Sequence, residues 1–118
     1  MNKTVLIADD SLFMRTRIKS ILERNGYVII SEASNGEEAF EKYKLHHPDI
    51  LLLDISMPKI NGLQALKQII HYHSDAVVIM FSALGQKTLI IDALQAGAKD
   101  FIVKPNFEQI IPVLNKFN

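Results

Sequence analysis

The sequence contains no cysteine and has no excess of either charge. Without cysteine the chain forms neither disulfides nor thiolate metal sites and has no cysteine nucleophile, which is typical of a cytoplasmic protein. The 13 basic and 13 acidic residues balance to a formal net charge of zero, so the basic surface that nucleic-acid binding needs is missing. We therefore expect a cytoplasmic protein that does not act by binding nucleic acid.

Long hydrophobic runs are also missing. The longest, residues 76–81, falls far short of the roughly 20 residues that a membrane-spanning helix needs. The N-terminal segment reaches an acidic pair before a signal-type apolar stretch develops, so we expect neither membrane insertion nor secretion. A hydrophobic content of 48% nevertheless excludes a disordered chain, and 118 residues fit one domain spanning residues 1–118.

Short apolar runs alternate with longer amphipathic stretches along the chain. The runs are continuously apolar, which is typical of parallel strands that are covered on both faces. The predicted strands are residues 5–8, 28–30, 50–53, 76–81 and 101–103, and the predicted helices are residues 13–24, 37–47, 63–72, 86–95 and 107–117. Five strand-then-helix units predict a single-domain α/β fold with a doubly wound, five-stranded parallel sheet.

Charged or hydroxyl side chains follow four of the five predicted strands. They are Asp9-Asp10 after the first strand, Asp54 after the third, Ser82 after the fourth and Lys104 after the fifth. Sheets of this kind bind ligands beyond the carboxyl ends of their strands. The sequence therefore predicts a functional site formed by these residues.

The three aspartates indicate a cation site. Carboxylates about 4 Å apart repel by about 4 kcal/mol at an effective dielectric near 20. Three aspartates and one lysine sum to −2, which one divalent ion neutralises, and oxygen ligands favour Mg²⁺ or Mn²⁺. The alternative is that Asp9 and Asp10 only cap the first helix.

Asp54 is a candidate nucleophile towards phosphorus because it follows a buried strand beside the predicted cation. Ser82 can donate a hydrogen bond to a phosphoryl oxygen, and Lys104 offers it a positive charge. The alternative for Asp54 is an ordinary turn residue at a strand end. The residues leave the Lys104–Pro105 bond open between cis and trans.

Taken in order along the chain, these residues resemble a known family. The sequence resembles the response regulator receiver domains, and among them the CheY-like stand-alone chemotaxis regulators. The resemblance covers essentially the whole chain. It depends on Asp9-Asp10, Asp54, Met57-Pro58, Gly62, Ser82-Ala83, Ala96-Gly97-Ala98 and Lys104-Pro105.

The resemblance implies a flavodoxin-like (βα)5 fold with strand order 2-1-3-4-5, of which this family is itself a standard example. It also implies a two-component response regulator that accepts a phosphoryl group on Asp54 from a sensor histidine kinase. In the family, Asp10 and Asp54 ligate Mg²⁺ directly together with the Ser56 backbone carbonyl, and Asp9 acts through a water molecule.

For the other site residues, the resemblance implies that Ser82 and Lys104 hold phosphoryl oxygens and that Phe101 is the switch aromatic. Ser82 stands where threonine is commoner, and Phe101 lacks the hydroxyl of the common tyrosine. Ser56 and Leu84 occupy the two positions that tune dephosphorylation. Since neither can orient a water molecule, we expect slow self-dephosphorylation.

The expected output is a surface of helix 4, strand 5 and helix 5 that binds a protein partner. We expect a regulator of the flagellar motor switch in chemotaxis, without an effector domain. The alternative is a phosphorelay intermediate or phosphate sink that passes its phosphoryl group to a histidine phosphotransfer protein. Beyond its own phosphorylation and dephosphorylation, we expect no conventional enzyme activity.

Three other classes fit less well. A flavodoxin-type cofactor binder would place its phosphate where Asp9 and Asp10 repel it, and an aspartyl phosphatase would usually carry an acid at position 56. A pure interaction module would not retain all the site residues.

The last predicted helix contains an unusual proline. Asn106 and Gln109 are spaced like a capping box, yet Pro112 falls five residues after the predicted start at residue 107. An interior proline costs about 3 kcal/mol because it removes a hydrogen bond. We therefore expect either a kink or a helix that begins near Pro112.

Overall fold

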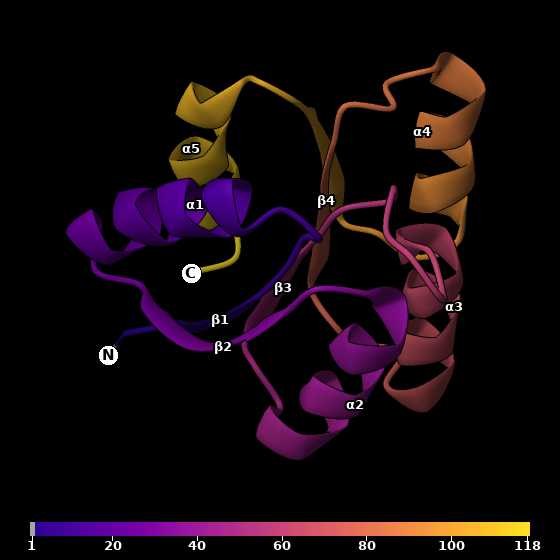
Figure 1. The fold of residues 1–118 in the computed structure, drawn as a ribbon, viewed down its shortest axis with the longest axis horizontal. Coiled ribbons are helices and arrows are strands. Elements are labelled where there is room, and N and C mark those ends of the chain that lie inside the picture. The colour runs from indigo at the N-terminus through magenta and orange to yellow at the C-terminus, as the bar shows by residue number, and fades with distance from the viewer. Residues whose placement is uncertain (1) are drawn as a thin grey trace.

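The computed structural model describes residues 2–118. Five parallel strands form one sheet in the order β2-β1-β3-β4-β5, which confirms the predicted fold class and strand order. Helices α1 and α5 cover one face of the sheet, and α2, α3 and α4 cover the other (Figure 1). Across residues 2–118, no helix combines the length and apolar character needed to span a membrane.

The strands are close to their predicted positions. They are β1 Thr4–Ala8, β2 Val28–Ala33, β3 Ile50–Leu53, β4 Val78–Ser82 and β5 Asp100–Val103. The prediction for β2 was three residues too short because the continuous apolar run ends before Ser31. As β2 lies at the edge of the sheet, it keeps polar side chains partly exposed.

The first four helices also agree with the sequence patterns to within one residue at each end. They are α1 Leu12–Arg24, α2 Gly36–His46, α3 Gly62–Tyr72 and α4 Lys87–Gln95. Side-chain caps begin three of them: Ser11 accepts from Met14 N at α1, Asn35 caps α2, and Asn61 forms a capping box with Gln64 at α3. These caps satisfy amide groups that a helix start leaves without partners.

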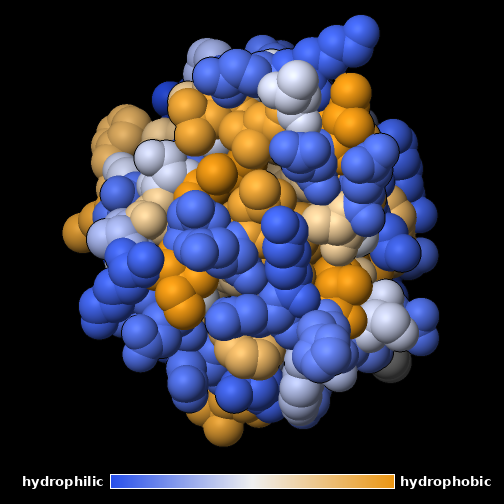
Figure 2. Space-filling model, turned by 90° about the vertical axis from the view of Figure 1, so that its right-hand side faces the viewer, coloured by the Kyte–Doolittle hydropathy of each residue, from blue (hydrophilic) through white to orange (hydrophobic). Residues whose placement is uncertain are grey.

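The sheet separates two hydrophobic clusters because successive strand residues point to opposite faces. In β1, for example, Leu6 packs towards α2 and α3, whereas Val5 and Ile7 pack towards Ile18 of α1 and Ile110 of α5. The runs are continuously apolar for this reason. Outside the core, the side of the molecule on which α3 and α4 lie shows hydrophilic residues with hydrophobic patches between them (Figure 2).

The C-terminal segment resolves the question about Pro112. A 3-10 turn, η1 Phe107–Gln109, precedes a short helix, α5 Ile110–Asn115. Pro112 lies in the first turn of α5, where no amide has an intrahelical partner, so no hydrogen bond is lost. This confirms a helix that begins near Pro112 and corrects the predicted continuous helix from residue 107. The capping-box prediction was wrong, since the Asn106 side chain makes no capping hydrogen bond.

Candidate functional site

The acidic residues meet where the strand order reverses between β1 and β3. Backbone pairing continues past both strand ends: Asp9 N donates to Ala33 O at 3.0 Å, and Asp54 N donates to Ala8 O at 2.9 Å. Asp9 and Asp54 therefore occupy neighbouring positions on adjacent strands. This reversal is the place where a doubly wound sheet opens a crevice for ligands.

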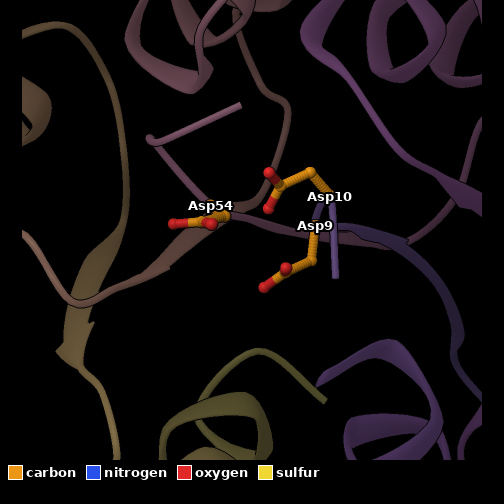
Figure 3. A group of neighbouring side chains, drawn as sticks. All are labelled: Asp9, Asp10 and Asp54. Carbon is orange, nitrogen blue, oxygen red and sulfur yellow. The ribbon is translucent and has the colours of Figure 1, made fainter. Parts of the chain in front are cut away.

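The three carboxylates form one group. One carboxylate oxygen from each of Asp9, Asp10 and Asp54 lies within 4.8 Å of the others, and Figure 3 shows the side chains entering from the ends of β1 and β3. Asp9 and Asp54 are only 2% and 5% exposed, whereas Asp10 is exposed. The predicted convergence of these residues is confirmed.

Lys104 bridges the two buried carboxylates. Its Nζ donates to Asp9 Oδ2 at 2.7 Å and to Asp54 Oδ2 at 3.3 Å, and its side chain is 14% exposed. Its backbone is fixed as well, since Lys104 N donates to Ser82 O at 2.9 Å. One ammonium against three carboxylates leaves the group two negative charges in excess.

The environment makes Asp54 harder to ionise. Burial is the largest influence and raises the pKa of Asp54, and the Asp9 carboxylate raises it further. Lys104 and the Ser82 hydroxyl oppose this, but the pKa remains above the ordinary carboxyl value. A cation or another positive group at this place would stabilise the ionised form.

The residues fit a hard divalent cation. All three acidic side chains offer oxygen ligands, and the exposed Asp10 carboxylate is open to an incoming ion. The alternative role of Asp9 and Asp10 as helix caps was wrong, because Ser11 caps α1 and no acidic residue lies in its first turn. Asp9 Oδ1 instead accepts from Ser11 N at 2.9 Å.

Comparison with known proteins agrees with this geometry. The family model described as "Response regulator receiver domain" matches residues 5–115. The chain belongs to the response regulator receiver family. This receiver domain is 50% identical over 117 residues to the chemotaxis protein CheY of Bacillus subtilis, and 49% identical over 117 residues to CheY of Thermotoga maritima, covering 98% of each chain in both cases.

Solved structures show the same relationship. This receiver domain matches a chain in the crystal structure of the CheX-CheY-BeF3-Mg+2 complex from Borrelia burgdorferi with a TM-score of 0.94 and 43% identity, covering 98% of this chain and 90% of that one. It matches the response regulator domain of Thermotoga maritima CheB with a TM-score of 0.89 and 38% identity, covering 99% and 94%. The chain is therefore the receiver domain of a two-component response regulator.

The remaining predicted residues lie in β4, β5 and the loops after β3 and β4. Ser82 ends β4, is completely buried, and its Oγ accepts from Leu84 N at 3.2 Å. Ser56 and Leu84 are exposed on the loops after β3 and β4. Phe101 in β5 is partly buried and packs against the cluster on the side of α2, α3 and α4. The Lys104–Pro105 bond, open in the sequence, is cis.

Two residues that hold the site were missed. Ser11 caps α1 directly after the acidic pair, and the preference of serine for this position could have revealed it. Arg15 donates to the backbone oxygen of Asp9 and to Glu32. Its two partners lie at the end of β1 and in β2, away from α1, so no local pattern in the sequence marks Arg15.

Proposed function

We propose that this receiver domain accepts a phosphoryl group on Asp54 from a phosphohistidine of a sensor histidine kinase. The observation that supports this best is the ion pair between Asp54 Oδ2 and Lys104 Nζ at 3.3 Å, beside two further carboxylates. An oxygen of Asp54 forms a bond to phosphorus while the N–P bond of the phosphohistidine breaks, and the electron pair stays on the imidazole nitrogen.

Phosphoryl transfer depends most on the positioning of the reacting groups and on the neutralisation of negative charge, and residues of the chain would supply both. Lys104, already within reach of Asp54, would pair with an oxygen of the transferred group. The Ser82 hydroxyl would donate to another phosphoryl oxygen. The hydrogen bond of Asp54 Oδ1 with Ile55 N at 2.8 Å orients the carboxylate and leaves Oδ2 towards Lys104.

A Mg²⁺ ion, which Mn²⁺ could replace, would be held by the carboxylates of Asp10 and Asp54 and by the Ser56 backbone carbonyl, with Asp9 acting through water. When bound, it neutralises the charge of the carboxylates and of the transferred group. Two observations support this ligand set: the oxygen atoms converge within 4.8 Å, and the Borrelia relative was solved with BeF3 and Mg+2.

Phosphorylation would switch the surface of α4, β5 and α5. A phosphoryl group on Asp54 attracts the Ser82 hydroxyl, and the space that Ser82 leaves admits the Phe101 ring. Phe101 pairs with Met80, which stands two residues before Ser82 on the same face of β4, so Ser82 and Phe101 lie in one neighbourhood. Ile91 and Leu94 on α4 are 41% and 43% exposed and provide apolar contacts for a partner. The phosphoryl group thus biases two states of one surface.

The phosphorylated state would be long-lived. Ser56 and Leu84 stand on the two loops that flank Asp54, and both are exposed towards solvent. Neither side chain carries an acid or an amide that orients an attacking water molecule. Slow self-dephosphorylation would be the only further reaction of a protein that is otherwise no conventional enzyme.

The partner would be the flagellar motor switch of a chemotaxis system in the cytoplasm. Relatives named chemotaxis protein CheY, which are 50% and 49% identical to this chain over 117 residues, support this output. The balanced charge of the chain supports a protein partner over nucleic acid. A histidine phosphotransfer protein is the competing partner, as in a phosphorelay or a phosphate sink.

Acetyl phosphate tests the chemistry directly. The protein is incubated with acetyl phosphate, with and without Mg²⁺, and its intact mass is followed, with Asp54→Asn as control. We expect one Mg²⁺-dependent phosphoryl adduct that is absent from Asp54→Asn. If no adduct forms, beryllofluoride titration distinguishes the need for a phosphohistidine donor from a metal site without a switch.

A pull-down tests the partner. The phosphorylated protein is offered purified motor-switch and histidine-phosphotransfer proteins, with Asp54→Asn as control. Phosphorylation-dependent retention by the motor-switch protein is the expected result. Transfer of the phosphoryl group to the phosphotransfer protein would instead assign the domain to a relay.

A further inference from the structure

Arg15 connects three elements beneath the acidic group. Its Nη1 donates to the backbone oxygen of Asp9 at 2.7 Å, and its Nε donates to Glu32 Oε1 at 3.0 Å. Arg15 lies in α1, Asp9 follows β1, and Glu32 lies in β2. The Arg15 side chain is only 15% exposed, so these contacts are shielded from competing water.

The backbone oxygen that Arg15 holds belongs to the peptide unit joining Asp9 to Asp10. Asp9 is already fixed on its other sides, because its amide donates to Ala33 O and its Oδ1 accepts from Ser11 N. The direction of the Asp10 side chain therefore depends on the orientation of this one peptide unit. Asp10 itself is exposed, and packing does little to hold it.

We propose that Arg15 is a positioning residue for the cation. Its guanidinium, braced by Glu32, holds the Asp9–Asp10 peptide in the orientation that brings both carboxylates to the ion. The planar fork of arginine suits this task, since one group donates to an oxygen in each of two directions. The inference rests on the proposed function, in which Asp9 and Asp10 serve a Mg²⁺ ion.

A purely electrostatic effect of Arg15 has the opposite sign. As a positive charge near three carboxylates, Arg15 opposes the binding of a cation, so its removal would tighten Mg²⁺ binding. As a positioning residue, its removal weakens Mg²⁺ binding. The direction of the change in Mg²⁺ affinity therefore separates the two effects.

Lys19 provides a matched control. Its Nζ lies 3.8 Å from Glu32 Oε2, and Lys19 belongs to the same helix as Arg15, one turn further on. Lys19 pairs with Glu32, whereas Asp9 is held by Arg15. Lys19→Gln thus removes a similar charge and a similar ion pair but leaves the Asp9–Asp10 peptide held.

The experiment measures the Mg²⁺ dissociation constant of the full chain by isothermal titration calorimetry. The variants are Arg15→Gln, Arg15→Lys and Lys19→Gln, each with its thermal unfolding recorded without metal. We expect Arg15→Gln and Arg15→Lys to bind Mg²⁺ about tenfold more weakly than wild type, as for other partners that orient metal ligands. Lys19→Gln should bind Mg²⁺ as wild type does or slightly more tightly.

Equal or tighter Mg²⁺ binding by Arg15→Gln would overturn the proposal, as would an equal loss in Lys19→Gln. If Arg15→Gln does not fold, Arg15→Lys decides: it keeps the positive charge but lacks the planar fork, so weaker Mg²⁺ binding supports positioning and unchanged binding overturns the proposal. A wild type that binds Mg²⁺ but takes no phosphoryl group refutes the proposed function alone. A wild type that binds no Mg²⁺ refutes both.

Discussion

The two loops that follow Asp54 and Ser82 differ in how they are held. The loop after β3, residues 55–61, follows Asp54 and is packed backbone against backbone: Gly62 N donates to Ile55 O at 2.8 Å, and a Cβ on Gly62 would lie 1.8 Å from Asp54 O. The loop after β4, residues 83–86, is exposed throughout and follows Ser82. There the hydrogen bond from Leu84 N to Ser82 Oγ is 3.2 Å long.

This difference separates two tasks. The loop after β3 is anchored at its end by the close backbone packing of Gly62 against Asp54 and Ile55, which holds Asp54 in place. The loop beside Ser82 lies in water and is held by fewer buried contacts, so its rearrangement costs less free energy. The fixed part of the site therefore lies after β3, and the more movable part after β4.

The largest expected effect follows from substituting Gly62, which ends the fixed loop after β3. Gly62→Ala places a methyl group against the carbonyl of Asp54, and this backbone cannot yield as a flexible side chain does. We expect the free energy of unfolding to fall by about 3 kcal/mol. Urea denaturation followed by circular dichroism measures it, and an unchanged midpoint would contradict the backbone packing.

A smaller effect concerns the charge of Asp54. Because the folded-state pKa of Asp54 is raised, ionising it costs folding free energy, and this cost grows as the pH rises from the ordinary carboxyl pKa through the raised value. Without metal at pH 7, Asp54→Asn should therefore melt higher than wild type, with the difference vanishing in acid. Mg²⁺ should raise the melting temperature of wild type more than that of Asp54→Asn. A lower melting temperature for Asp54→Asn at pH 7 would contradict this.

A third prediction concerns the loop after β4 and the proposed lifetime of the phosphoryl group. Leu84→Glu places an exposed carboxylate where it can orient a water molecule, and we expect the phosphorylated protein to lose its label several-fold faster. Leu84→Ala is the matched control, since it removes the same side chain without adding an acid. Loss of label is followed by intact mass after removal of acetyl phosphate. Rapid loss from wild type itself would refute the slow reaction.

The smallest effect is expected at Gly85, the counterpart of Gly62 in the movable loop. The atoms nearest to a Cβ on Gly85 would be the two methyl groups of Val103, at 3.0 Å, which belong to a side chain that can shift. Alanine also restricts the unfolded chain, which offsets part of this contact. Gly85→Ala should change the free energy of unfolding by less than about 1 kcal/mol. A loss as large as that of Gly62→Ala would remove the distinction between the loops.

The strand ends could be predicted because each of them follows a local pattern in the sequence, a short apolar run. Each buried strand is a short apolar run, and a parallel sheet brings all its carboxyl ends to one edge, so Asp54 and Lys104 could be placed together without coordinates. The strand order came from the resemblance to the receiver family and not from the pattern. The end of β2 was missed because an edge strand tolerates Ser31 and Glu32 on a partly exposed surface.

The amino-acid sequence alone was enough to establish the five βα units and the residues at the strand ends. Strands buried on both faces appear in the sequence as short, continuously apolar runs that end at these polar residues. The sequence also identified Pro112 as a constraint, but the short 3-10 turn that places this proline in the first turn of α5 is a matter of tertiary packing. The same holds for the link from Arg15 to Asp9 and Glu32, and for the division between a fixed and a movable loop. Such contacts join residues from separate elements, so they exist only once the sheet and its helices have assembled.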